Sequence, residues 1–258
     1  MSSLDLFSVK NKTAIVTGGG RGLGEQIAEG LAEAGANVVV CSRKLEACER
    51  VSEKLKQMGV KALALQCDVT NQKQVEEVVK KTVEEFGGVD ILVNNSGTSW
   101  TGPALDLPVD KWEKVMDVNV KGVFLFSQAV GKVMVEQGSG KIINIASLAG
   151  FGGAPPTIMD TIAYNTSKGA VITFTKDFSA KMAMHGIQVN AIAPGFFPTK
   201  ITGAMLEKMY KQIVQLIPSG RLGTEEDLKG AAVFLSSRAS DYITGQVLSV
   251  DGGKSALI

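Results

Sequence analysis

The chain has 258 residues, of which 45% are hydrophobic and 21% charged, and its formal net charge is +1. This composition is typical of a globular protein with a good core, and it argues against a nucleic-acid-binding surface or a polybasic membrane-binding face. The first twelve residues include Asp5 and no apolar run long enough for a signal peptide, and nowhere do about eighteen apolar residues follow one another, so we expect a cytoplasmic protein that spans no membrane.

The first half of the chain alternates short apolar runs with longer amphipathic ones. Residues 13–17 are typical of a buried strand, and Leu23, Ile27 and Leu31 then recur at helical spacing until Gly35. The alternation repeats, and further strands are expected at 37–41, 62–66 and 91–94.

The second half continues the pattern, with expected strands at 141–145, 188–193 and 246–250. Strands that are apolar on both faces and separated by amphipathic helices indicate a parallel sheet covered by helices on each side. No Pro/Gly/Ser-rich linker divides the chain. We therefore predict an α/β fold in which residues 1–258 form a single doubly wound Rossmann-type domain with a seven-stranded parallel sheet.

One segment, residues 195–218, breaks this rhythm. It contains Met, Phe and Pro, is poorly periodic, and follows the sixth expected strand on the side where such sheets bind ligands. We predict that it is a substrate lid. The alternative is a pair of short helices that fill the surface.

The turn between the first strand and the first helix is rich in glycine. Such a turn lets the backbone approach a pyrophosphate, whose charge meets the positive end of the helix dipole. The usual GxGxxG spacing fails, because Leu23 stands where the third glycine would be. The pattern that holds is TGxxxGxG, on Thr17, Gly18, Gly22 and Gly24.

Three more motifs follow along the chain: Asn94-Asn95-Ser96-Gly97 after the fourth strand, the YxxxK pair Tyr164 and Lys168, and Pro194-Gly195 after the sixth strand. With TGxxxGxG, they make the chain similar to the short-chain dehydrogenases/reductases over nearly its whole length. One departure is Ser96, where that family usually has Ala. We expect this change to alter little.

The residues after the second strand decide which cofactor is expected. NAD enzymes place a carboxylate there for the ribose hydroxyls, whereas NADP enzymes place cations for the 2′-phosphate. This chain reads Ser42-Arg43-Lys44 with no acid before Glu46, and Arg21 in the glycine turn adds a second cation for the same pocket. We therefore predict NADP(H).

The family resemblance supplies the remaining cofactor contacts. It implies that Asp68 and Val69 contact the adenine and Asn95 the ribose region, and that Phe197 and Thr199 lie by the nicotinamide carboxamide. The full predicted cofactor set is Gly18, Arg21, Gly22, Leu23, Gly24, Ser42, Arg43, Asp68, Val69, Asn95, Tyr164, Lys168, Phe197 and Thr199.

Histidine and cysteine are too sparse for several other chemistries. His185 is the only histidine and precedes Gly186 at the end of a helical run, which is typical of a helix C-terminus. The cysteines, at 41, 48 and 67, have no CxxC spacing. We therefore expect no metal site and no Ser-His-Asp triad.

Tyr164 is the acid/base candidate that remains. Lys168 lies four residues later on an expected helix, so both side chains project from one face. A charge about 4 Å away would lower the pKa of the phenol against the opposing effect of burial. Ser147, at the end of the fifth strand, can donate to a substrate oxygen. The resemblance adds Asn119, which would hold a water linking Lys168 to solvent, so the expected catalytic residues are Asn119, Ser147, Tyr164 and Lys168.

These features predict an NADP(H)-dependent oxidoreductase that reduces a ketone to a secondary alcohol. Within the family, the chain looks most like 3-oxoacyl reductases, so we expect a 3-oxoacyl or similar carbonyl substrate. A keto-sugar or gluconate-type polyol dehydrogenase is the alternative, and an NADP-binding sensor without catalysis is a minority one.

Two further expectations concern assembly and the substrate pocket. Residues 115–135 are apolar around more of the helix than one sheet face can cover, and family members pair this helix and the one after Tyr164 across a dyad, so we predict a homotetramer. The span from Ser147 to Tyr164 is longer than family members commonly show. We expect residues 148–160 to form an extra wall of the substrate pocket, with a solvated excursion as the alternative.

Overall fold

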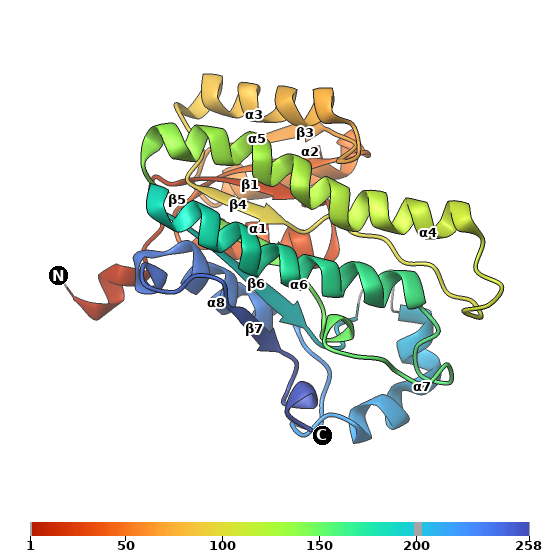
Figure 1. Cartoon of the computed structure of the whole chain (residues 1–258). Coiled ribbons are helices and arrows are strands. Elements are labelled where there is room, and N and C mark those ends of the chain that lie inside the picture. The colour runs from red at the N-terminus through yellow and green to blue at the C-terminus, as the bar shows by residue number, and fades with distance from the viewer. Residues whose placement is uncertain (1, 199–202, 258) are drawn as a thin grey trace.

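Seven parallel strands form the centre of the computed structural model, which describes residues 2–198 and 203–257. Their order across the sheet is β3-β2-β1-β4-β5-β6-β7, and Figure 1 shows helices on both faces. The strands are β1 (Thr13–Thr17), β2 (Asn37–Ser42), β3 (Ala62–Gln66), β4 (Ile91–Asn94), β5 (Gly140–Ile145), β6 (Ile187–Pro194) and β7 (Val247–Val250). The predicted doubly wound seven-stranded sheet is confirmed, and every strand lies within one or two residues of its expected range.

The helices are α1 (Gly22–Glu33), α2 (Leu45–Gln57), α3 (Gln72–Phe86), α4 (Val109–Met116), α5 (Gly122–Gln137), α6 (Ile162–Met182), α7 (Gly203–Gln215) and α8 (Glu225–Ser236). A π-helical turn, η2 (Asp117–Lys121), joins α4 to α5, and a short 3₁₀ turn, η3 (Leu148–Gly150), follows β5.

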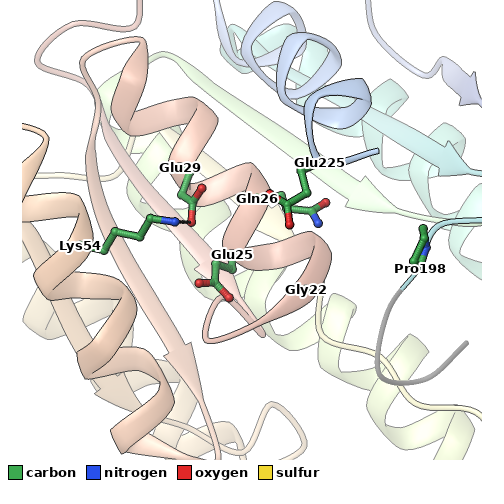
Figure 2. Close-up of a pocket in the computed structure, with 7 residues that line it drawn as sticks. All are labelled: Gly22, Glu25, Gln26, Glu29, Lys54, Pro198 and Glu225. Atoms are coloured by element: carbon green, nitrogen blue, oxygen red, sulfur yellow. Dashed lines mark hydrogen bonds and ion pairs between the residues drawn. The ribbon is translucent and has the colours of Figure 1, made fainter. Parts of the chain in front are cut away.

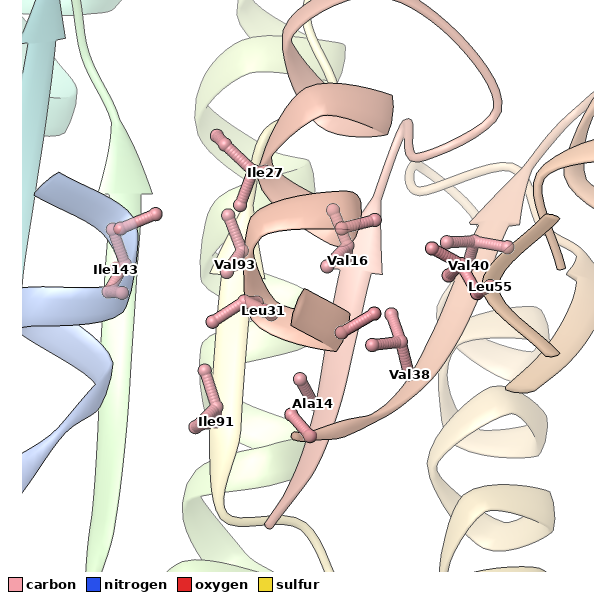
Figure 3. Packing of buried hydrophobic residues seen from close by; sticks show 14 of the residues in the cluster. Ala14, Val16, Ile27, Leu31, Val38, Val40, Leu55, Ile91, Val93 and Ile143 are labelled. Carbon is pink, nitrogen blue, oxygen red and sulfur yellow. The ribbon is translucent and has the colours of Figure 1, made fainter. Parts of the chain in front are cut away.

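Alternate residues of each central strand enter different hydrophobic cores. Ala14 and Val16 of β1 pack with α1, α2 and α8, whereas Ile15 between them packs with α3 and α5 on the other face. Figure 3 shows the first of these cores, with Ile27 and Leu31 of α1 against the sheet. Because both faces are covered, β1 is buried along its whole length, which explains its unbroken apolar sequence.

Helices α4 and α5 run on through η2 as one long element, Val109–Gln137. Among the described residues, this is the one helix whose length and composition would allow it to cross a membrane. Half of its most apolar window is buried inside the protein, and α5 contributes Phe126, Val130 and Met134 to the core. Its apolar character is accounted for in part by this packing.

The strand order reverses direction between β1 and β4. The chain leaves β1 toward β2 and β3 on one side, and returns to build β4 to β7 on the other. In open α/β sheets, ligands bind at the carboxyl ends of the strands where such a reversal leaves a crevice. The carboxyl ends of β1, β4 and β5 carry the glycine turn, the Asn-Asn-Ser-Gly segment and Ser147, respectively.

Candidate active site

Thr17, the last residue of β1, joins the two halves of the sheet at the reversal point. Its hydroxyl oxygen accepts hydrogen bonds from the backbone N–H groups of Asn95 and Ser96, each 3.0 Å long. The Asn95 side chain returns the link by donating to the carbonyls of Thr17, at 2.9 Å, and Gly18, at 3.3 Å. These bonds hold the glycine turn against the segment after β4. The sequence motif contains Thr17, but sequence reasoning assigned it no role.

Glycine is favoured at two positions of the turn for different structural reasons. A Cβ on Gly24 would collide with the Asn95 side chain and the Gly18 carbonyl, so close packing requires glycine there. Gly22 has a φ of +57°, which favours glycine, and a Cβ on it would meet nothing within 4 Å. The backbone at Gly22 is therefore open to a ligand.

The first turn of α1 can receive an anion. Arg21, the N-cap residue, makes no side-chain capping hydrogen bond, so the first N–H groups of the helix keep their donors for another partner. They also stand at the positive end of the helix dipole. An open glycine backbone beside uncapped helix N–H groups fits a pyrophosphate, and thus fits NADP(H).

Arg50 of α2 fastens this turn from behind. Its guanidinium donates two hydrogen bonds to the Glu25 carboxylate, at 2.7 and 2.9 Å, and one to the carbonyl of Gly20, at 3.1 Å. Sequence reasoning missed Arg50, because nothing in the pattern of α2 indicates a contact with a turn almost thirty residues earlier.

A cavity of about 460 Å³ lies beside the start of α1 (Figure 2). Its lining is acidic: it includes Glu25, Glu29 and Glu225 and one cation, Lys54, which pairs with Glu29 at 2.5 Å. Glu25 is paired with Arg50 and Glu29 with Lys54, so these cations already have carboxylate partners and the carboxylate side of the cavity disfavours phosphate. Gly22 also lines the cavity, so the predicted pyrophosphate position is at the uncapped first turn of α1, on the side of Gly22 away from the carboxylates.

The predicted 2′-phosphate cations lie at the ends of the glycine turn and of β2. Arg21, Arg43 and Lys44 are all exposed, and in the described part of the chain their side-chain nitrogens form no ion pair within 4.0 Å. The Ser42 hydroxyl donates to the carbonyl of Lys44, at 3.1 Å, and accepts from its N–H, at 3.3 Å. Ser42 thus shapes the turn that presents Arg43.

Asp68 and Val69 follow β3, the neighbour of β2. Burial raises the pKa of Asp68, but two hydrogen bonds from Thr70 and the charges of Arg43 and Lys121 outweigh it and lower the pKa overall. The electrostatic effect of Arg43 indicates that Arg43 and Asp68 share one end of the sheet. Val69 is buried against Gly122.

The last two predicted cofactor residues follow β6. Phe197 is buried, and its ring lies so close to Gly223 that a Cβ there would collide with it. Thr199 lies outside the described residues, as does part of the predicted lid at 195–218.

Ser147 and Tyr164 meet at the carboxyl end of β5. Ser147 is the residue before η3 and is 9% exposed, and its hydroxyl accepts from the N–H of Ala149 at 3.2 Å. Burial raises the pKa of the Tyr164 phenol, and the nearby Ser147 hydroxyl lowers it by less. The structure therefore brings together the predicted proton donor and the predicted oxyanion partner.

Lys168 occupies the next turn of α6 below Tyr164. Its Nζ donates to the carbonyl of Ile145, at 2.6 Å, and lies 5.6 Å from the centroid of the Tyr164 ring. Burial lowers the pKa of Lys168 to about 8. The sequence predicts a net lowering of the pKa of the phenol by the lysine, and in the structure the pKa is instead raised, because burial is the largest effect on the phenol and the ammonium donates to a backbone carbonyl.

Asn119 lies in the π-helical turn η2 and is completely buried. Its side chain accepts from the N–H of Thr98, at 2.8 Å, and donates to the Thr98 carbonyl and to the Ser167 hydroxyl, each at 2.9 Å. Ser167 in turn donates to the carbonyl of Tyr164, at 2.7 Å. A π turn inside a helix is often found at a functional site. Here it links the segment after β4 to the helix that carries Tyr164.

Gly97 separates Asn119 from Lys168. A Cβ built on Gly97 would be 3.6 Å from Asn119 Oδ1 and 3.8 Å from Lys168 Nζ. All four predicted catalytic residues therefore lie within one region, at the carboxyl ends of β4 and β5.

A buried polar network supports this region from the sheet side. The Asn94 side chain donates to Ser127, at 3.0 Å, and to Asn144, at 2.9 Å, and Asn144 donates to Thr175, also at 2.9 Å. The network ties β4 and β5 to α5, which follows η2, and to α6, which carries Tyr164. Sequence reasoning placed Asn94 in a motif but did not find this network, since Ser127, Asn144 and Thr175 are polar residues in largely apolar runs far apart along the chain.

Comparison with known proteins extends these observations. Residues 18–255 match the family model described as enoyl-(acyl carrier protein) reductase. The chain is 40% identical over 252 residues to the 5-keto-D-gluconate 5-reductase of Escherichia coli, and the alignment covers 96% of this chain and 97% of that protein. It is 39% identical over 244 residues to a 3-oxoacyl-[acyl-carrier-protein] reductase of Staphylococcus epidermidis, with 94% and 98% covered.

Solved structures show the same fold at full length. The crystal structure of a gluconate 5-dehydrogenase from Burkholderia cenocepacia, in complex with NADP and tartrate, superposes with a TM-score of 0.94 at 37% identity. The alignment covers 100% of both chains. The match therefore includes every strand of this chain that is followed by a predicted site residue.

Proposed function

The chain belongs to the short-chain dehydrogenase/reductase family, and from this premise we propose that it is an NADP(H)-dependent oxidoreductase that interconverts a ketone and a secondary alcohol. The observation that carries the proposal is the position of Tyr164 close to Ser147 and 5.6 Å, measured from its ring centroid, from Nζ of the buried Lys168. This arrangement lies next to an anion-receiving glycine turn.

Each catalytic residue has a defined role in this proposal. Bound NADPH supplies the hydride for the carbonyl carbon. Tyr164 donates its phenolic proton to the carbonyl oxygen, and Ser147 donates a hydrogen bond to the same oxygen as it gains charge. Lys168 restores charge balance beside the phenolate and holds the nicotinamide ribose, and Asn119 positions the segment that faces Lys168.

The cofactor contacts complete the proposal. Gly18, Gly22, Leu23 and Gly24 receive the pyrophosphate, Arg21 and Arg43 receive the 2′-phosphate beside Ser42, and Asp68 and Val69 flank the adenine. Phe197 and Thr199 border the nicotinamide. One domain of residues 1–258 holds both ligands, the segment 195–218 covers the substrate, and the protein works in the cytoplasm.

An assay of NADPH oxidation in the presence of a panel of ketones tests the function. We expect oxidation that depends on the ketone and yields the corresponding alcohol. If the protein binds NADPH but fails to oxidise it with every carbonyl compound tested, it would instead be a sensor. The panel includes 5-keto-D-gluconate, because relatives at 40% identity carry that name, and a 3-oxoacyl thioester.

Ketone reduction should lose rate as the pH rises through about 8. Below this pH Lys168 is charged, and the pKa of Tyr164, raised by burial, keeps the phenol protonated and able to donate. Above it Lys168 loses its charge and no longer stabilises the phenolate that proton donation leaves behind. The measurement is kcat/KM for reduction from about pH 6 to about pH 10. A profile that stays flat to the upper end would contradict this role of Lys168.

The protein should form a homotetramer. Phe124 and Val135 of α5 are 45% and 38% exposed, and Ile162 at the start of α6 is 44% exposed, so both helices leave apolar side chains uncovered in one copy. Light scattering at micromolar concentration measures the mass. A monomeric mass would refute the prediction.

A further inference from the structure

Two side chains from different parts of the chain hold the backbone of the glycine turn. From the end of β4, Asn95 donates to the carbonyls of Thr17 and Gly18. From α2, Nη2 of Arg50 donates to the carbonyl of Gly20 at 3.1 Å. Together they engage three carbonyl oxygens of the turn, and Arg50 holds the one that lies next to Arg21.

The direction of the Gly20 carbonyl matters for a bound anion. Because a trans peptide group is planar, its C=O and its N–H point in opposite directions. The carbonyl is held toward α2, so the N–H of Arg21, in the same peptide group, points away from α2. Phosphate is bound by N–H groups and repelled by carbonyl oxygens. The hydrogen bond from Arg50 therefore keeps an acceptor of the turn on the α2 side and a donor on the other.

A carboxylate fixes the guanidinium that makes this bond. Nη1 and Nη2 of Arg50 donate to the two carboxylate oxygens of Glu25, at 2.7 and 2.9 Å. Nη2 is thus shared between Glu25, in the first turn of α1, and the carbonyl of Gly20, just ahead of that helix. A planar fork with several donors can make all three bonds at once. The bidentate pair prevents the guanidinium from turning away from the carbonyl.

Arg50 also connects the two cations predicted to bind the 2′-phosphate. It lies on α2, which begins two residues after Arg43, and it contacts Gly20, which precedes Arg21. A Cβ on Gly20 would be 3.1 Å from the Cβ of Ala47, so the glycine turn and the first turn of α2 pack directly against each other. A change at Arg50 therefore acts on the backbone that carries Arg21.

We infer that Arg50 is a positioning residue for NADP(H), which acts through the Gly20 carbonyl on the pyrophosphate turn and on Arg21. The inference rests on the cofactor site of the proposed function. Without this bond the turn must be ordered when the cofactor binds, and that ordering costs affinity. The proton donor Tyr164 lies at the other end of the cofactor, so the chemical step should keep its rate.

The variant Arg50→Met tests this role, because methionine keeps an aliphatic stem and removes every donor. The Arg50 side chain is 57% exposed, so little packing is lost. We expect the Kd for NADPH, titrated by its fluorescence in the absence of a ketone, to rise about fivefold to tenfold. The KM for NADPH should rise in the same way, whereas kcat at saturating NADPH should stay within about twofold of the wild-type value.

Lys54→Met is the matched control. Lys54 lies one turn further along α2 and pairs with Glu29, one turn further along α1, at 2.5 Å. Among the described residues its ammonium donates to this carboxylate and not to a carbonyl of the glycine turn. The control thus removes the same charge and an ion pair between the same two helices, and its Kd should stay within about twofold of the wild-type value.

Thermal unfolding gives a second readout that does not depend on turnover. Without NADPH, it checks that both variants fold. The rise in Tm on adding NADPH measures cofactor binding, and it should be smaller for Arg50→Met than for Lys54→Met.

The outcomes separate this inference from the proposed function. Equal losses of affinity in the two variants would overturn it, since the effect would then come from charge or from the ion pairs between α1 and α2. An unchanged Kd in Arg50→Met would overturn it as well. If the Kd values differ as expected but no ketone is reduced, the inference stands and the oxidoreductase function fails. If the unmodified protein does not bind NADPH, both are overturned.

Discussion

Replacing Tyr164 with phenylalanine should lower kcat for ketone reduction by about 10²- to 10⁴-fold, the usual contribution of a positioned general acid. NADPH should bind almost as tightly as before. The substitution removes one hydroxyl and keeps the ring, so packing in α6 changes little. Because the pKa of Tyr164 is raised by burial, its phenol is the protonated form that reduction needs.

The measurement combines steady-state kinetics with a separate titration of NADPH, followed by its fluorescence. Retention of more than a few per cent of the wild-type rate would remove Tyr164 from the mechanism. A loss of cofactor binding equal to the loss of rate would also count against it, since that result indicates a structural role.

Lys168→Ala makes an informative comparison. The Lys168 side chain donates to the Ile145 carbonyl, and its Nζ lies 5.6 Å from the centroid of the Tyr164 ring. Its removal should weaken NADPH binding and lower kcat together, whereas Tyr164→Phe should lower kcat alone. The two variants thus separate proton donation from the positioning of the cofactor.

The sequence predicts the sheet well because each strand is apolar on both faces and is bounded by glycine or polar residues. For example, 13–17 and 91–94 match β1 and β4 residue for residue. It also predicts which residues gather at the site, since Ser147 and Tyr164 belong to motifs whose order along the chain follows the order of the elements.

Contacts between distant segments could not be predicted in the same way. The hydrogen bonds of Thr17 with Asn95, and those of Arg50 with Glu25, join residues that no periodicity relates. The π-helical turn around Asn119 is equally invisible, because its sequence differs from an α-helical one only in a single buried polar residue. The expected lowering of the Tyr164 pKa failed for a related reason: it depends on the burial and on the partner of Lys168, which only the structure supplies.

Cofactor preference carries the second large prediction. NADPH should be preferred over NADH by at least about a hundredfold in kcat/KM, since two charge-assisted hydrogen bonds from Arg21 and Arg43 contribute roughly 1.5–3 kcal/mol each. Both guanidinium groups are exposed at the same end of the sheet, and neither forms an ion pair within the described residues. They therefore break no ion pair of the described residues when they bind phosphate.

The double variant Ser42→Asp/Arg43→Gln should reverse this preference. A carboxylate at position 42 can still accept from the N–H of Lys44, as the Ser42 hydroxyl does at 3.3 Å, so the turn after β2 should keep its shape. The new charge repels the 2′-phosphate and accepts hydrogen bonds from the ribose hydroxyls of NADH. Lys44→Ala is the control. Lys44 is exposed one position further along, and its loss should change the ratio little.

The ratio of kcat/KM for NADPH to that for NADH, measured with one ketone for all variants, decides the matter. If the unmodified enzyme used NADH and NADPH with equal kcat/KM, the assignment of Arg21 and Arg43 to the 2′-phosphate would be wrong. If the double variant lost activity with both cofactors, the turn would depend on the hydrogen bond that the Ser42 hydroxyl donates to the Lys44 carbonyl. The single variant Arg43→Gln would then have to show the loss of preference for NADPH. The oxidoreductase function would survive either result, because it depends on Ser147, Tyr164 and Lys168 at the other end of the cofactor.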